Sequence, residues 1–554
     1  MAVALLLLWV LCNAIRVNGE ESNGQCDHKL KFNPRPHSVS IQEFGAIGDG
    51  KTLNTIAFRN AIFYLKSFAD KGGAQLYVPP GQWLTGSFNL TSHLTLFLEK
   101  DAIILGSQDP SHWGIVEPLP SYGRGIELPG RRYRSLVNGY MLRDVVITGK
   151  SWTNLDLNVA LGDNGTIDGQ GSVWWEWFTS HSLNYTRPHL VEFVSSEYVL
   201  VSNISLLNAP AYNIHPVYCS YGYVSDMSMF NHFCLSMYVE GSLRGDVLIL
   251  MFEYVLNTDF QNVHIHNISV YAPPESPYTV GIVPDSSDNI CIEDCNISMG
   301  HDAIAFKSGW DEYGIAYGRP TTIAHVRRVD LRSSTGSSLA FGSEMSGGIS
   351  DILVEEVHLY DSLTGIEFRT TTGRGGYIKE IMISDVDLLN VNTSFAAIGD
   401  YGSHPDDKFD PDAFPFRTTI GRGGYIKEIM ISDVDLLNVN TSFAAIGDYG
   451  SHPDDKFDPD AFPVLEKITL QNIIGTNITI AGNFKGIEES PFTFICLSNI
   501  SLSINSTSLS PWQCSYVSGF SESVFPEPCP ELMNSSTSSC GILMLELQFY
   551  NIIL

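Results

Sequence analysis

A short strand motif recurs along this chain at an almost constant interval. The central residues of successive copies lie 32 residues apart from Ile297 to Val329, then 28 apart to Val357 and 29 apart to Val386. A unit of this length is too short to bury a core of its own, so stacked units must share one continuous apolar column. The sequence therefore predicts an all-β protein built as a parallel β-helix. The motif copies are Asn203-Ile-Ser-Leu, Asn267-Ile-Ser-Val, Asn296-Ile-Ser-Met, Arg328-Val-Asp-Leu, Glu356-Val-His-Leu, Asp385-Val-Asp-Leu and Asn472-Ile-Ile.

Two other all-β folds agree less well with this pattern. A flat sandwich would favour hairpin signals such as Asn-Gly between its strands, and these are scarce here. A propeller blade needs about four strands, whereas the recurring unit carries roughly one strand motif. With 44% hydrophobic and 17% charged residues, the chain can bury a substantial core and does not have a disordered composition.

The N-terminal residues indicate secretion. Ala4 to Cys12 form an apolar run that is too short to span a bilayer, so residues 1–19 are interpreted as a signal peptide, with an uncleaved anchor as the alternative. Sequons such as Asn89-Leu-Thr and Asn477-Ile-Thr are typical of a secreted glycoprotein. We expect the solenoid to occupy residues 38–530, with a short helix from Asn54 to Asp70 near its start. Residues 531–554 are expected to form an irregular tail.

Three segments interrupt the rhythm of short strands. Residues 150–162 and 221–261 separate stretches that read as continuous without them, and we interpret both as retained-intron translation, with a genuine extra hairpin or lid as the alternative. Phe368–Pro415 recurs as Phe416–Pro463, and the copies differ only at Thr372 and Ile420. Such near-identity indicates either a recent tandem duplication or an error in the gene sequence.

Charge and cysteine content exclude several classes of function. The formal net charge of −29 makes nucleic acid an improbable partner. Cys291 and Cys295 have no second Cys/His pair at metal-site spacing, so we expect no zinc site and no cofactor. Without Cys12 of the signal peptide nine cysteines remain, and without Cys234 of the second interrupting segment eight remain, an even number that fits an oxidising compartment. We expect a monomer without a stable membrane span.

A polar cluster follows the strand signals between Val280 and Gly314. It includes Asp285, His301, Asp302 and Lys307, and the flanking sequences are Tyr278-Thr-Val-Gly-Ile-Val-Pro-Asp-Ser-Ser287 and Gly300-His-Asp-Ala-Ile304. This stretch resembles plant polygalacturonases, the pectin-cleaving glycoside hydrolases of family twenty-eight. The resemblance implies a right-handed parallel β-helix with an N-terminal cap. It also implies an acidic cell-wall polysaccharide, pectin or homogalacturonan, as the partner.

The resemblance also implies the catalytic positions. Family members use three aspartates, the middle one as general acid and the outer two to handle water, and these positions are Val280, His301 and Asp302 here. Asp302 is therefore the retained catalytic candidate. His301 is the second candidate, because imidazole can donate a proton near neutral pH. The alternative for His301 is a turn residue that packs against the next coil.

Five further residues are predicted to meet the substrate. The family's substrate-gripping Arg-Ile-Lys falls at Glu367-Phe368-Arg369, so Arg369 keeps a positive charge and Glu367 reverses one, and the family's Gly-His-Gly histidine is Ser337. Lys307 is expected to meet an acidic sugar. Asp285, Glu344 and Glu367 are carboxylates that could pair with Asp302 in an altered inverting mechanism, and turn capping is the alternative for Asp285 and Glu344.

These residues support two functions of different classes. The family resemblance predicts a secreted hydrolase that cleaves α-1,4-galacturonan with inversion in the plant cell wall. The replacements at Val280, His301 and Glu367 favour the alternative, a catalytically weakened pectin-binding or wall-structural protein on the same fold. A third possibility, a non-functional product of a faulty gene sequence, follows from the interrupting segments.

Overall fold

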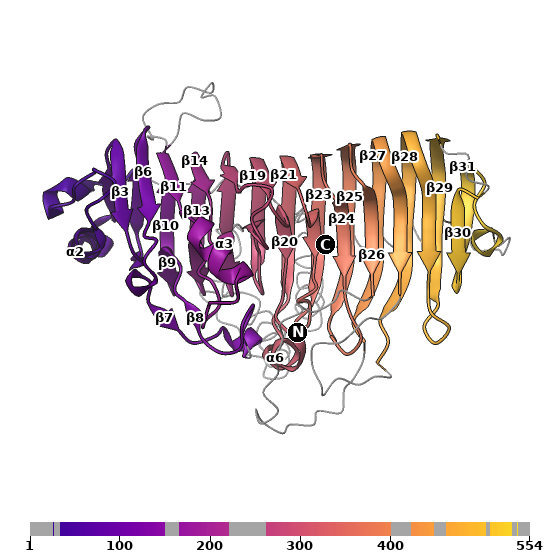
Figure 1. Ribbon diagram of the computed structural model, residues 1–554, viewed down its shortest axis with the longest axis horizontal. Coiled ribbons are helices and arrows are strands. Elements are labelled where there is room, and N and C mark those ends of the chain that lie inside the picture. The colour runs from indigo at the N-terminus through magenta and orange to yellow at the C-terminus, as the bar shows by residue number, and fades with distance from the viewer. Residues whose placement is uncertain are drawn as a thin grey trace, which may run out of the picture.

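Three parallel ladders of strands wind the chain into a long solenoid, in which successive coils stand side by side along the molecular axis (Figure 1). The structure is a computed structural model that describes residues 26, 34–123, 125–149, 165–220, 262–399, 423–447, 461–505, 510–533 and 540. The predicted all-β fold and its β-helix architecture are confirmed. The short β-branched motifs form the strands, because side chains that alternate between two faces can fill the shared interior from one face only.

The first ladder begins at the N-terminal end and runs the length of the solenoid. Its members are β1 (His37–Ser40), β2 (Ala74–Val78), β5 (Leu94–Leu98), β10 (Arg143–Thr148), β13 (Glu197–Ser202), β16 (Val263–His266) and the first parts of β19 (Asp288–Met299), β21 (Thr321–Ser333), β23 (Ile349–Tyr360), β25 (Tyr377–Leu389), β27 (Tyr425–Ile446), β28 (Val464–Lys485), β29 (Phe492–Ile504) and β31 (Val517–Phe525).

The second ladder continues each coil after a bend. It contains β3 (Gly81–Thr85), β6 (Ala102–Gly106), β11 (Gly165–Asp168), β14 (Ile204–Leu207), β17 (Ser269–Tyr271) and the later parts of the long strands from β19 to β31.

The third ladder carries the predicted site residues. It contains β4 (Phe88–Asn89), β9 (Val137–Tyr140), β12 (Val191–Val194), β15 (Tyr212–Val217), β18 (Val280–Ile282), β20 (Ile304–Phe306), β22 (Ser337–Phe341), β24 (Thr364–Arg369), β26 (Thr393–Ile398), the ends of β27 and β28, and β30 (Trp512–Ser515). A separate antiparallel pair consists of β7 (Ile115–Val116) and β8 (Arg132–Tyr133).

The core is a set of side-chain columns that run along the axis. Equivalent positions of neighbouring coils carry similar apolar residues, and Phe306, Phe341 and Phe368 stack with ring centroids 5.2 and 4.8 Å apart. Fully burying a side chain such as phenylalanine contributes about 1.5–3 kcal/mol, so one column stabilises several coils together. One such column is formed by the buried residues Ile292, Val326, Val354, Ile383, Ile431 and Leu470.

The expected helix lies near the N-terminal end of the solenoid. Helix α2 spans Thr55–Leu65, follows the N-cap position Asn54, and passes into the 3-10 helix η2 (Lys66–Lys71). Its inward residues, including Phe58 and Ile62, belong to the main core, which confirms the helical spacing. The other helical elements are η1 (Ile41–Phe44), η3 (Pro110–His112), η4 (Pro120–Tyr122), α3 (Ser172–Thr179), α6 (Asp311–Tyr317) and η5 (Pro530–Leu532).

The two proposed inserts and the proposed signal peptide lie outside the described residues, and so do residues 400–422 and 448–460 of the duplicated region. The coils on either side of the two proposed inserts remain in register: β10 and β16 both pair with β13, while β11 pairs with β6 and β14. The two copies of the 48-residue repeat stack as neighbouring coils, with Tyr377 opposite Tyr425 and Thr393 opposite Thr441. No helix among the described residues is long and apolar enough to cross a membrane.

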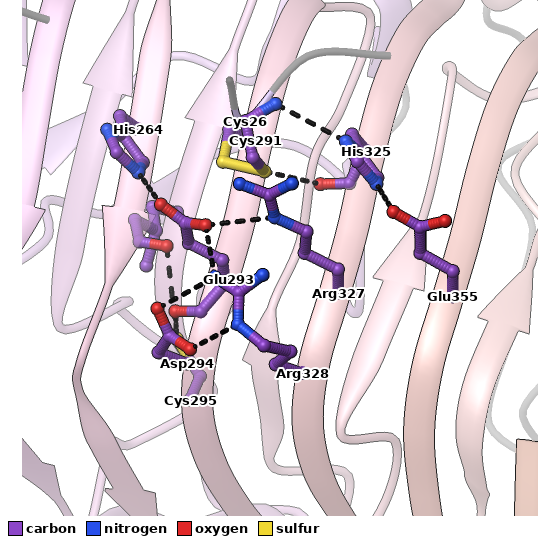
Figure 2. Close-up of a disulfide and its surroundings, with 11 residues drawn as sticks. Cys26, His264, Cys291, Glu293, Asp294, Cys295, His325, Arg327, Arg328 and Glu355 are labelled. Carbon is purple, nitrogen blue, oxygen red and sulfur yellow. Dashed lines mark hydrogen bonds and ion pairs between the residues drawn. A yellow bond between two sulfur atoms is a disulfide. The ribbon is translucent and has the colours of Figure 1, made fainter. Parts of the chain in front are cut away.

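A disulfide fixes Cys26 to the first ladder at Cys291, 265 residues further along the chain. Figure 2 shows this bond among polar side chains from neighbouring strands. The backbone N–H of Cys26 donates to Nδ1 of His325 at 3.3 Å, and Nε2 of the same ring lies 2.9 Å from Glu355. Since the two sulfurs are bonded to each other, they cannot serve as thiolate ligands. The remaining described cysteines form Cys496–Cys540 and Cys514–Cys529, or are the buried thiols Cys219 and Cys295.

Glu293 is the centre of the charged network beside this disulfide. It accepts from Nε2 of His264 at 3.0 Å, from Arg327 at 3.0 Å and from Arg328 at 2.6 Å (Figure 2). Burial opposes ionisation of Glu293, but these three donors outweigh it and lower its pKa to about 2. Glu293 is therefore an ionised carboxylate that is matched by neighbouring donors.

Candidate active site

Asp302 lies where the chain enters β20, and Arg369 lies at the far end of β24, two coils away. The Arg369 guanidinium reaches Asp302 with two bonds, Nη1 to Oδ2 at 2.7 Å and Nη2 to Oδ1 at 2.8 Å. A third donor to the carboxylate is the backbone N–H of Ser337, at 2.8 Å. Both side chains are only 2% exposed, so this is a buried bidentate ion pair.

The charge state of Asp302 follows from this pairing. Burial favours the neutral acid and alone would raise the pKa. The positive charge of Arg369 and the contact with His301 outweigh burial, and they hold the pKa of Asp302 well below its usual range. Asp302 is therefore a carboxylate at all ordinary pH values. In this state it cannot supply a proton as a general acid.

Glu367 completes the same cluster from the other side of Arg369. Its Oε2 accepts from Arg369 Nε at 2.7 Å and also from the Ser337 hydroxyl. Ser337 is thus bonded to both carboxylates, through its N–H to Asp302 and through its hydroxyl to Glu367. Glu367 is buried and faces its own cation, and the cluster places one guanidinium between two carboxylates.

The third catalytic position of the family is apolar here. Val280 is buried in a small cluster that is separate from the main core and is partly covered by Ile126. This cluster gives the neighbourhood of Asp302 a hydrocarbon wall where the resemblance implies a water-binding aspartate. Its buried members are Ala211, Tyr212, Val280, Val283, Ala305 and Ala340.

His301 lies between the buried ion pair and the surface. Its Nδ1 is 3.3 Å from Asp302 Oδ1, and its ring lies 5.0 Å from that of Tyr278, which in turn meets Phe178 of α3 edge-on at 5.8 Å. With 13% of its side chain exposed, His301 is the most accessible member of the Asp302 cluster. Nδ1 is directed to Asp302, so Nε2 is the ring atom left for an exchange of protons with a substrate.

Lys307 and Glu344 form a second ion pair. Lys307 Nζ donates to Glu344 Oε2, and both groups are largely buried. Burial opposes ionisation of Glu344, but the charge of Lys307 outweighs it and lowers the pKa of Glu344. The structure therefore joins these two predicted substrate residues to each other rather than to the Asp302 cluster.

Asp285 belongs to a third buried cluster, which the sequence reasoning missed. Its Oδ2 accepts from the Tyr122 hydroxyl at 2.7 Å and lies 3.3 Å from His215 Nε2. His215 Nδ1 lies 3.2 Å from Glu192, which also pairs with Arg132 at 2.7 Å. The signal that could have found it is a histidine inside the buried strand β15, since a buried imidazole needs polar partners.

This third cluster brings His189, Glu192 and His215 close enough together to raise the question of a metal. The donor set does not fit one. Nδ1 of His189 accepts from the backbone N–H of Tyr212 at 3.4 Å, so the proton of the neutral ring sits on Nε2, and Glu192 is already neutralised by Arg132. Burial, helped by His215, holds the pKa of His189 well below its usual range, which keeps this ring uncharged.

Comparison with known proteins places these features in a family. Residues 134–231 and 252–404 match "Glycosyl hydrolases family 28". A Vitis vinifera protein described as "Probable polygalacturonase" is 38% identical over 546 residues, 97% of this chain and 90% of the relative.

Solved structures share the fold. An exopolygalacturonase from Thermotoga maritima is 20% identical with a TM-score of 0.59, over 94% of this chain and 97% of the other. A family 28 exopolygalacturonase from Yersinia enterocolitica is 18% identical with a TM-score of 0.62, over 90% and 80% of the two chains. The sequence match along nearly the whole length and the shared β-helix together establish that this chain belongs to glycosyl hydrolases family 28, among the polygalacturonases.

Proposed function

We propose that this protein acts outside the cell on the α-1,4-galacturonan of pectin, and that its hydrolytic rate is low. The low hydrolytic rate is inferred from the bidentate ion pair between Asp302 and Arg369. An inverting glycosidase needs one carboxyl group to protonate the leaving oxygen and another to activate water. Here one carboxylate is fixed in its ionised form, and the neighbouring positions are Val280 and His301.

The roles that remain possible are limited by this arrangement. Asp302 suits the activation of water, because it is ionised and held in place by three donors. Proton delivery to the leaving oxygen falls to His301, through Nε2, and requires the imidazolium form.

Arg369 bears on the second candidate function, a pectin-binding or wall-structural protein. Its guanidinium already bonds Asp302, Glu367 and Ser337 of its own chain. A guanidinium committed in this way is a weak partner for a galacturonate carboxylate. Pectin binding without hydrolysis would then be weak and would fall as salt is added.

Reducing-sugar release from polygalacturonate tests the proposal. We expect a low rate in the wild type and a further loss of about 10²–10⁴-fold in Asp302→Asn, the range for removing a general acid or base. The matched control is Asp294→Asn, which removes a different arginine-paired aspartate from the first ladder and should leave the rate unchanged. Val280→Asp with His301→Asp should raise the rate more than either change alone, because acid and base act in one step.

The possible outcomes separate the two functions. A wild-type rate that survives Asp302→Asn would contradict the assignment of this site. No release by the wild type together with salt-sensitive binding of polygalacturonate would favour the binding protein. Neither release nor binding, in any of these variants, would exclude both functions.

A further inference from the structure

An open groove of about 520 Å³ lies at the turns that lead from the second ladder into the third. We propose that this groove binds an uncharged sugar unit of the polysaccharide. The choice of a sugar as ligand rests on the function proposed above, but the groove is distinct from the Asp302 cluster. It is lined by Ser334, Asp361, Ser362, Leu363, Asn390, Val391, Asn392, Asn438 and Asn440.

The groove follows the same edge of the solenoid as His301. The turns stack through backbone bonds, from Thr335 N–H to Gly300 O at 3.0 Å, then from Asn392 N–H to Ser362 O at 3.0 Å and from Asn440 N–H to Val391 O at 3.4 Å. Four coil steps of about 4.8 Å separate the turn of His301 from that of Asn440, a span of about 19 Å. A polysaccharide that passes His301 along this edge therefore reaches the groove.

Two rows of asparagine line the groove, and the first has a structural reason to exist. Asn390 and Asn438 have left-handed backbones, with φ of 56° and 57°, which asparagine tolerates better than most residues. Their side chains form a ladder, with Asn438 donating to Asn390 at 3.0 Å and Asn390 donating to Asp361 at 3.0 Å. This row is explained by the turn and needs no ligand.

The second row lacks that explanation. Neither Asn392 nor Asn440 has a positive φ, and both residues are exposed. Asn440 donates to Asn392 Oδ1 at 3.2 Å. A carboxamide has two N–H donors and an oxygen with two lone pairs, so this bond leaves each side chain with further donors and acceptors toward the groove. Such groups match sugar hydroxyls, which both donate and accept.

The charge and shape of the groove favour a neutral sugar over galacturonate. Asp361 is its one ionisable lining residue, so a carboxylate ligand would meet a like charge and no cation. Leu363, with 45% of its surface exposed, offers an apolar patch to the C–H face of a sugar ring. Seven of the nine lining residues are polar, which suits the many hydroxyl groups of a neutral sugar.

Both copies of the 48-residue repeat contribute side chains to the groove. Asn390 and Asn392 come from the first copy, whereas Asn438 and Asn440 come from the second. Each pair meets because identical residues stand in register on β25–β26 and β27. Deleting residues 416–463 should bring β28 onto β25, since Val464 and Ile473 already occupy the register positions of Tyr425 and Val434. The shortened solenoid keeps Asp302 and loses Asn438 and Asn440, two of the four asparagines that line the groove.

Calorimetric titration of the full chain with neutral β-1,4-galactotetraose and xylotetraose tests the inference, with tetragalacturonate as the charged probe. The protein is made in a bacterial periplasm, where disulfides form and sequons stay unmodified. We expect at least one neutral probe to bind. Asn392→Ala should weaken that binding about fivefold, the effect of one lost hydrogen bond, and Asn392→Ala with Asn440→Ala about 25-fold. The deletion should abolish it, with the far-ultraviolet circular dichroism of a β-protein retained.

The point variants decide the matter if the deletion does not fold. Binding of neither neutral probe, or binding unaffected by the asparagine changes, would overturn the inference, as would tighter binding of tetragalacturonate in the groove. Asn392 and Asn440 begin Asn-Thr-Ser sequons, so a glycan on either residue of the protein from its own tissue would also overturn it by filling the groove. Neutral binding without Asp302-dependent hydrolysis would refute the proposed catalysis alone.

Discussion

Replacing Arg369 with methionine should destabilise the protein strongly and in a way that depends on pH. The change removes the cation shared by Asp302 and Glu367 and leaves two buried carboxylates that keep the Ser337 N–H, the Ser337 hydroxyl and the nearby His301 ring. Removing one partner of a buried ion pair typically costs about 3–5 kcal/mol, since the remaining charge has neither water nor a partner. We expect a loss in this range in the free energy of unfolding at pH 7.

Acid should reverse part of that loss. In the wild type the pKa of Asp302 is depressed, so its contribution to stability is complete above the unfolded value near 4 and is lost only as the pH falls below it. In Arg369→Met the cation that depresses the pKa of Asp302 is gone, so burial and the negative charge of Glu367 raise that pKa. The folded state then takes up a proton that the unfolded state does not. One proton taken up between pH 7 and pH 5 recovers at most about 2.7 kcal/mol.

Urea unfolding monitored by tryptophan fluorescence, at pH 7 and pH 5, measures both effects. The matched control is Arg328→Met. Arg328 also pairs with two carboxylates, Glu293 and Asp294, but 37% of its side chain is exposed. An exposed pair contributes about 0–1 kcal/mol, so the control should lose little. A loss below about 1 kcal/mol for Arg369→Met at pH 7, or a loss of equal size at both pH values, would refute the account of a buried, charge-locked site.

Two further predictions concern stability. Cys26→Ser with Cys291→Ser should lower the free energy of unfolding by about 2–5 kcal/mol, because the disulfide closes a loop of 265 residues, and urea unfolding with and without reductant checks this. His189→Phe should make the protein less sensitive to acid: the depressed pKa of His189 gives stability that is complete above about pH 6.5 and is lost below it, so the wild type should lose about 2 kcal/mol more than the variant between pH 7 and pH 5. An equal loss in both proteins would contradict the neutral state assigned to His189.

The fold could be predicted because its determinants are local and repeated. The motif at Val329, Val357 and Val386 recurs once per coil, and these three residues face each other in register on β21, β23 and β25. The helix after Asn54 was equally readable from its apolar spacing. The ends of the strands could not be predicted as well. Each long strand from β19 onward passes through a bend and belongs to two ladders, and no residue type marks the position of the bend in the sequence.

The site could be predicted only as a set of positions. The family frame located Asp302, Glu367 and Arg369, and the structure brings these three together. It did not show that Lys307 pairs with Glu344, or that Asp285 turns toward Tyr122 and His215, because each of these contacts joins coils or loops far apart in the chain. The partner that a side chain meets depends on the register between neighbouring coils. The sequence of a single coil does not specify that register.

The departures from the family pattern compensate one another. Taken alone, Glu367 would be a buried carboxylate where the resemblance implies an arginine, and burying an unpaired charge is costly. Arg369 and the Ser337 hydroxyl satisfy it, and Ser337 itself stands where the resemblance implies a histidine. With Val280 and His301 in place of two aspartates, only Glu367 shares the guanidinium with Asp302, and Arg369 bonds Asp302 with both terminal nitrogens.

If the residues of this site had been replaced independently of one another, some buried charges would be expected to lack a partner. In this chain each charge of the cluster has a partner: Asp302 and Glu367 both bond Arg369, and Ser337 bonds both carboxylates. The replacements therefore describe a site with its own consistent electrostatics rather than a damaged copy of the family site. Val280→Asp and His301→Asp together restore both carboxyl positions that the resemblance implies, and acid and base act in one step, so the paired revertant is the informative test of catalysis.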